Sequence, residues 1–127
     1  MIPEVADLRA EAAELDALLR PLPDAGYDRV TAFKGYTIAD VLRHLHQGDH
    51  MGLMSVESPQ RFREWYAGRT ERRARGVSTR DDARLEFGHL TGNALREAWI
   101  GTLETLSRRL ACVLPRSDTG WPPGTNC

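Results

Sequence analysis

The chain has 127 residues, of which 41% are hydrophobic, and a formal net charge of −1 at pH 7. This length accommodates one domain with a modest core, and the near-neutral charge argues against a general attraction to nucleic acid or to a membrane surface. No apolar run approaches the roughly 18 residues that a membrane-spanning helix needs.

No secretory signal is visible, because the N-terminus carries Glu4 and Asp7 and has no basic segment followed by an apolar one. The two cysteines, Cys112 and Cys127, do not form a disulfide framework. We therefore expect a cytoplasmic protein with reduced thiols.

Apolar residues at alternating spacings of three and four predict a helix of about four turns near the N-terminus. Pro21 and Pro23 end this helix, because proline cannot continue one. Its inward stripe consists of Val5, Leu8, Ala12, Leu15 and Leu19.

The stretch from Gly35 to Leu45 predicts a turn, a capped helix start and an inward histidine. Thr37 and Asp40 have the spacing of a capping box, in which each side chain bonds the other residue's backbone amide. The helix is expected to run from 37 to about 51 or 52. His44 lies at the edge of the apolar stripe, so we expect its imidazole to point toward the bundle interior. That stripe consists of Ile38, Leu42 and Leu45, with Val41 beside it.

Ser58 and Pro59 predict the N-cap and first position of a shorter helix over 60–67. Phe62, Trp65 and Tyr66 are expected to anchor it on the bundle. Residues 68–78 lack apolar periodicity, which predicts a solvated connection. The arginines between 61 and 84 are interleaved with acidic residues and have no aromatic platform beside them, which favours a salt-bridged surface over nucleic-acid binding.

Residues 81–90 predict another helix with Leu85 as its clearest inward residue, and Thr91 is expected to cap the last long helix. That last helix gives the strongest periodic signal in the chain and ends before Pro115. Its inward residues are Leu95, Trp99, Leu103, Leu106, Leu110 and Val113.

These elements predict an all-α fold, an up-and-down bundle of three long helices and one or two short ones. We expect a bundle domain over 1–115 and a tail rich in proline and glycine over 116–127. In that tail only Trp121 has much surface to bury.

The order and spacing of several motifs carry a family resemblance. These motifs are the segment 23–32, then Gly35-Tyr36-Thr37-Ile38-Ala39-Asp40, His44-Leu45, Asp49, Leu90-Thr91 followed by Leu95 and Trp99, and Trp121 before a Pro-Pro-Gly turn. They span nearly the whole chain. Together they resemble the metal-binding, DinB-like helical domain of the mycothiol-dependent maleylpyruvate isomerase family, closest to its actinobacterial branch.

The resemblance implies a DinB-like bundle with a three-ligand divalent-metal site that binds a thiol as thiolate. In the family an early histidine, matched here by His44, is joined by a Glu and, four residues later, a His from a fourth helix. The sequence ends at Cys127, where that helix is expected to begin, so we expect the fourth bundle helix and two of the three ligands to be missing. His44 is then the candidate metal ligand and Asp49 an auxiliary one, with zinc as the expected metal and mycothiol as the thiol that the family implies.

A second arrangement on the same helix has spacing that permits metal binding. His46 and His50 are four residues apart and can share a face, with Asp49 three residues after His46. His44 and His46 differ by about 200° around the helix, so all three histidines cannot hold one ion. The alternative, which the pattern favours, is a solvated polar face; His89 is expected on the surface.

Two hypotheses describe the function. The first is a metal-binding domain related to thiol-dependent isomerases or transferases, with an incomplete metal site and its enzymatic activity left open. The second is a non-catalytic helical module that self-associates or binds a partner. A bundle without its fourth helix exposes an apolar groove, through which the second hypothesis expects a homodimer.

Overall fold

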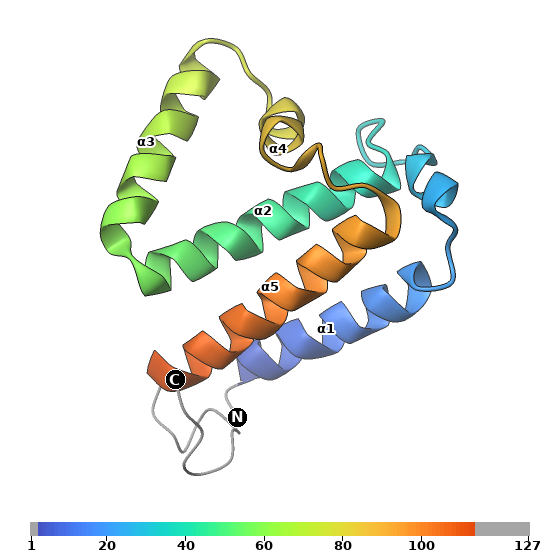
Figure 1. The fold of residues 1–127 in the computed structure, drawn as a ribbon, viewed down its shortest axis with the longest axis horizontal. Helices are drawn as coiled ribbons and strands as arrows, with labels where there is room; N and C mark the ends of the chain where they lie inside the picture. Colours follow the sequence, from blue (N-terminus) through green and yellow to red (C-terminus); the bar gives the residue numbers. More distant parts are fainter. Residues whose placement is uncertain (1–2, 114–127) are drawn as a thin grey trace.

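The computed structural model describes residues 3–113, and every regular element in this part of the chain is a helix (Figure 1). The predicted all-α fold is confirmed. The elements are α1 (Pro3–Leu19), the short 3-10 helix η1 (Asp24–Asp28), α2 (Ile38–Glu57), α3 (Pro59–Ala74), α4 (Thr79–Phe87) and α5 (Gly92–Val113). None of these described helices has the length and apolar character needed to cross a membrane. The predicted tail over 116–127, with Trp121, lies outside the described residues.

The three long bundle helices are α1, α2 and α5, and α5 packs against both of the others (Figure 1). Near the start of α5, Arg96 Nη1 donates to Asp16 Oδ1 at the end of α1 (2.7 Å). At the other end, Arg109 Nε donates to Glu57 Oε1 at the end of α2 (3.4 Å). The crossover through α3 and α4 returns the chain to the start of α2, so α2 and α5 run in the same direction and α1 runs opposite to them.

The core is built on the α5 stripe that the sequence predicts. Leu95, Trp99, Leu103 and Leu106 are all buried, whereas Val113, at the end of the predicted stripe, is exposed. A buried side chain of this size contributes roughly 1.5–3 kcal/mol relative to an exposed one. The stripe packs against Ala12 and Leu19 of α1, Tyr27 of η1, and Ala39 and Leu42 of α2.

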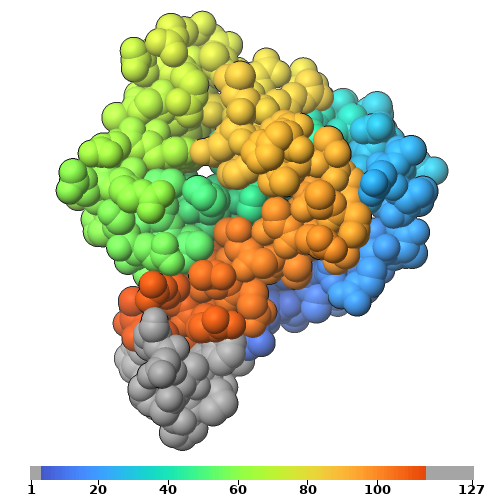
Figure 2. Space-filling view, viewed as in Figure 1, coloured from blue at the N-terminus to red at the C-terminus, as the bar shows by residue number. Residues whose placement is uncertain are grey.

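Helix α3 is longer than the predicted segment 60–67 and includes most of the predicted solvated connection. Its N-cap is confirmed, because the Ser58 side chain accepts from the Arg61 amide and Pro59 follows it. The prediction of a solvated connection over 68–78 is wrong for 68–74, which are helical, because Arg and Glu favour a helix without needing an apolar stripe. The helix ends at Ala74, and Gly76 (φ +91°) stops it from continuing, because the Gly76 and Val77 amides there donate to the carbonyls of Arg73 and Arg72. No α3 residue is buried, and α3 lies at the edge of the molecule (Figure 2).

One prediction about the segment before α5 is wrong, and one contact there could not have been predicted from local spacing. Leu85 is exposed, because α4 instead turns Ala83 and Phe87 inward. Thr91 directly precedes α5, and its carbonyl accepts from the Leu95 amide (3.3 Å). The amide of Asn93 donates to Asp24 Oδ1 of η1 (2.9 Å), a residue 69 positions away that spacing along one helix cannot predict.

Cys112, near the end of α5, is disulfide-bonded in the structure. The prediction of reduced thiols is therefore wrong for this residue. Two cysteines are too few for a disulfide framework, but their number does not exclude a single bridge, which is why the sequence argument fails here.

Candidate functional site

The start of α2 is a rigid platform built from the motif that the sequence singles out. Lys34 and Gly35 both have positive φ (51° and 72°), which forms a tight turn ahead of the helix. The capping box is confirmed, because Asp40 N donates to Thr37 Oγ1 (3.0 Å) and Thr37 N donates to Asp40 Oδ2 (3.1 Å).

Asp40 also joins this platform to α4. Arg84 donates to both carboxylate oxygens of Asp40 (2.8 and 2.7 Å), and the Asp40 side chain is fully buried. Burial alone would raise the pKa of Asp40, but the hydrogen bonds from Arg84 and Thr37 outweigh it and hold the pKa below its usual value. Asp40 therefore acts as a structural anchor that fixes where α2 begins.

His44 is exposed on α2, so the prediction that its imidazole points inward is wrong. The inward face of α2 includes Leu42 and His46, because α4 and α5 both pack on that side. His44 lies about 200° around the helix from Leu42. The apolar stripe used for the prediction is offset from the true buried face, as the partly exposed Leu45 (39%) also shows.

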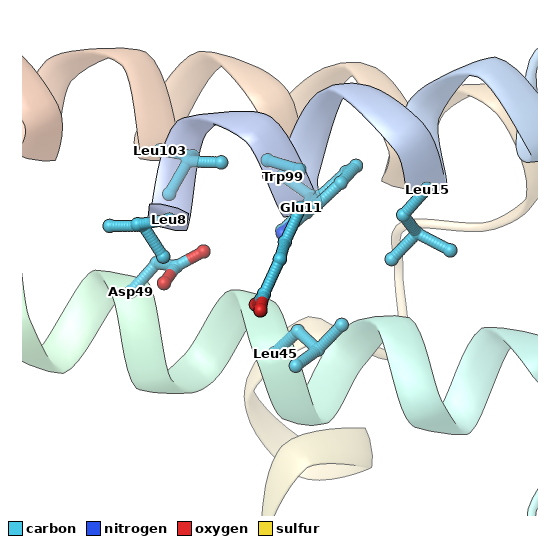
Figure 3. Close-up of a pocket in the computed structure, with 8 residues that line it drawn as sticks. Leu8, Glu11, Leu15, Leu45, Asp49, Trp99 and Leu103 are labelled. Atoms are coloured by element: carbon cyan, nitrogen blue, oxygen red, sulfur yellow. The ribbon is translucent and has the colours of Figure 1, made fainter. Parts of the chain in front are cut away.

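Asp49 points into a groove between α1 and α2 whose floor is α5 (Figure 3). One part of the groove is a hollow of about 140 Å³, in which the carboxylates of Asp49 and Glu11 project between the helices from opposite walls. Burial raises the pKa of Asp49 to about 6, although a hydrogen bond with Trp99 opposes the rise. The hollow is otherwise lined by Leu8, Ala12, Leu15, Leu45, Trp99 and Leu103.

A second hollow of about 340 Å³ continues the groove and is lined almost entirely by apolar side chains. The two hollows share Leu15 and Leu45, so they form one continuous groove, which we call the α1–α2 groove. The remaining lining residues of the second hollow are Leu18, Leu19, Leu22, Thr31, Ile38, Val41 and Leu42.

The structure does not bring the two predicted ligands together. His44 and Asp49 are five positions apart, which places them about 140° apart around the helix, and only Asp49 lines the groove. In the part of the chain that the structure describes, no three His, Cys, Asp or Glu side chains are arranged to hold a metal ion.

The alternative ligand set of His46, Asp49 and His50, which lies within the described residues, is not arranged to hold a metal ion either. The prediction that these residues form a solvated polar face is also wrong, at His46. His46 is buried, and its ring packs on Phe87 of α4 (centroids 4.4 Å apart) and lies near the ring of His50 (6.3 Å). Burial lowers the pKa of His46, and nearby His50 adds to this effect while Glu86 opposes it. His46 is therefore a neutral packing residue at neutral pH. His89 is exposed, as expected.

Sequence reasoning missed the hydrogen bonds through which α3, α4 and α2 are joined at Glu86. Glu86 of α4 accepts from Trp65 Nε1 of α3 (2.7 Å) and from Gln47 Nε2 of α2 (3.3 Å). These residues are 21 and 39 positions from Glu86, so no local pattern could have paired them. Glu86 therefore joins three helices through one carboxylate.

Comparison with known proteins gives a family and two relatives. The family model described as mycothiol maleylpyruvate isomerase N-terminal domain matches residues 8–126. Two curated proteins of Mycobacterium tuberculosis, the uncharacterized proteins MT0041 (strain CDC 1551 / Oshkosh) and Rv0036c (strain ATCC 25618 / H37Rv), are each 33% identical over 123 residues. That alignment covers 95% of this chain and 47% of each relative, so the chain spans about half the length of the curated relatives it matches. No solved structure gives a significant match.

Proposed function

This chain belongs to the mycothiol maleylpyruvate isomerase N-terminal domain family. From that premise we propose that it is a DinB-like helical domain related to thiol-dependent enzymes, in which α2 supplies a divalent-metal ligand. The proposed ligand is His44. Asp49 is left out of the ligand set, because it points into the α1–α2 groove on a different side of α2.

The exposure of His44 on a fixed helix is the observation that carries this proposal. The capping box and the contact between Asp40 and Arg84 fix the first turn of α2, and His44 follows one turn later. A ligand on such a helix is held in place before the metal arrives, which reduces the entropy that binding would otherwise cost.

Residues 3–113 do not by themselves fit a complete metal centre, since no set of three donors is assembled there. The proposal therefore requires the remaining ligands to come from outside the described residues, and we derive no chemical step through the metal. Zinc is proposed because imidazole is among its usual ligands. Mycothiol is proposed as the thiol because of the family alone. A cytoplasmic location is proposed because a small-molecule thiol such as mycothiol is kept reduced there.

Metal content of the chain purified without a histidine tag tests the proposal. After incubation with zinc and removal of excess metal, we expect ~1 zinc per chain in the wild type, as for a single site. His44→Ala should lose most of this zinc, because it removes the proposed ligand. His89→Ala is the matched control, because His89 is also exposed and has no role in the proposal.

The same samples test the thiol. In the cobalt-substituted protein, mycothiol should produce a thiolate-to-cobalt charge-transfer band that S-methylated mycothiol does not produce. Equal zinc content in the wild type and both variants would exclude His44 as a ligand. If zinc binding depends on His44 but the cobalt-substituted protein gives no charge-transfer band with mycothiol, the metal-ligand part of the proposal stands and mycothiol is excluded as the thiol.

A further inference from the structure

Two neighbouring histidines on α2 have buried ring nitrogens without a hydrogen-bond partner. The Nδ1 atoms of His46 and His50 are both buried, and neither is paired with any residue that the structure describes. His46 is only 3% exposed, whereas His50 is partly exposed. Buried polar atoms in folded proteins are normally paired with protein, water or an ion, because leaving them unpaired costs stability. Packing alone therefore does not explain why two imidazoles, rather than two apolar side chains, lie here.

The two rings are placed one helical turn apart on α2. Their centroids are 6.3 Å apart, and the ring planes are inclined by 62°. Two imidazoles that share one zinc ion, each with a nitrogen ~2.0–2.1 Å from the metal, have ring centres roughly 5–6 Å apart. Histidines four residues apart on a helix are also the pair that binds zinc in helical metalloprotease motifs. Small side-chain rotations would therefore bring a nitrogen of each ring onto one ion.

The surroundings of this histidine pair favour a bound cation. Burial and the neighbouring His50 lower the pKa of His46, although Glu86 opposes the shift, so the ring is held in the neutral form that binds metals. The carboxylate of Glu86, fixed by hydrogen bonds from α2 and α3, supplies a nearby negative charge. Phe87 of α4 covers both rings, with centroids 4.4 and 5.6 Å away. An ion can enter beside His50, which is the more exposed of the two histidines.

We propose that His46 and His50 hold one exchangeable zinc ion through their imidazole nitrogens, with water in its remaining coordination positions. Asp49 takes no part, because it lines the α1–α2 groove. The site is separate from the ligand proposed above, since His44 lies about 200° around α2 from His46. Two protein ligands hold zinc more weakly than the usual three or four. This ion therefore dissociates when free zinc is removed and does not add to the zinc retained in the test of His44.

Zinc titration of the full chain with isotope-labelled histidines, followed by nitrogen NMR of the rings, tests the proposal. The chain has four histidines, so each can be assigned and followed separately. We expect one ring nitrogen of His46 and one of His50 to shift together, with the same half-saturating zinc concentration. His89, which is exposed, should not follow them. Both shifts should persist in His44→Ala. A response of His46 and His50 without one of His44 would overturn only the earlier metal proposal, and the reverse would overturn only this one.

Replacing one member of the pair separates shared binding from independent binding. His50→Gln is used because His50 is partly exposed, so the fold should be retained, and a thermal melt checks this. In this variant the zinc concentration that half-saturates the His46 shift should rise at least about tenfold, whereas the matched control His89→Gln should change it less than about twofold. An unchanged His46 titration in His50→Gln, separate midpoints for the two wild-type histidines, or ring nitrogens of both that do not shift at about 1 mM zinc would each overturn the proposal.

Discussion

The carboxylate of Asp49 is partly buried between apolar side chains in the α1–α2 groove. Burial raises its pKa to about 6, and the hydrogen bond with Trp99 compensates only in part. The folded state therefore favours the protonated carboxyl. The resulting contribution to stability is fully present below pH ~4, the ordinary pKa of the unfolded chain, and is lost as the pH rises through about 6.

We predict that Asp49→Asn stabilises the metal-free protein in a pH-dependent way. The amide cannot ionise, so the variant should gain about 1–2 kcal/mol over the wild type at pH 8, after allowance for solvent screening, and little at pH 4. Urea denaturation at both pH values measures this difference. Asp7→Asn, at an exposed position on α1, should show no such dependence. The same gain at pH 4 and pH 8 would mean that Asp49 is not held in a desolvating groove.

At the scale of elements, α3 is the helix with the weakest attachment, since it buries no residue of its own. Its specific contacts with the rest of the molecule include the bond from Trp65 to Glu86 (2.7 Å) and the ion pair of Arg72 with the buried Asp82 (3.0 Å). Both contacts reach α4 rather than the core helices. We therefore expect α3 to open at a lower free energy than α1, α2 or α5.

Glu86→Ala should loosen α3 selectively. The substitution removes the acceptor of both Trp65 and Gln47, at a cost of about 1–3 kcal/mol. Amide hydrogen exchange should accelerate in α3 while protection of α5 changes little. Glu64→Ala, at an exposed site on α3, is the control and should change neither. Faster exchange in α5 to the same extent as in α3 would show that Glu86 supports the whole bundle instead.

At the scale of the whole molecule, α5 holds the bundle together, because it packs on both α1 and α2. Trp99 lies in the middle of its buried stripe and is 3% exposed, and it also forms part of the groove floor beside Asp49. The Trp99 side chain is therefore part of both the hydrophobic core and the floor of the α1–α2 groove.

Trp99→Ala should nearly unfold the protein. A large-to-small change at a buried aromatic costs roughly 3–5 kcal/mol, a large part of the ~5–15 kcal/mol that a small domain has in total. Thermal melts followed by circular dichroism measure the loss. Tyr66→Ala is the comparison, because Tyr66 is about half exposed and its loss should shift the melting temperature only slightly. If the two variants melted together, Trp99 could not be a core residue.

The sequence by itself determined the elements whose cause is local. The capping box of Thr37 and Asp40 depends only on a spacing of three residues, and the structure reproduces both of its hydrogen bonds. The stripe from Leu95 to Leu106 repeats with the helical period, and it is buried as predicted. The motifs around these two features were also enough to identify the family that the comparison later matched.

Only the tertiary structure decided which face of α2 is the inner one. Two neighbouring helices, α4 and α5, both pack on α2, so the buried face lies between them and includes His46 instead of His44. The Asp24 cap of α5 and the Glu86 link between three helices likewise join residues far apart in sequence. A helical period specifies that a stripe exists, but the elements that pack against a helix determine which stripe is buried, and those contacts form only when the chain folds.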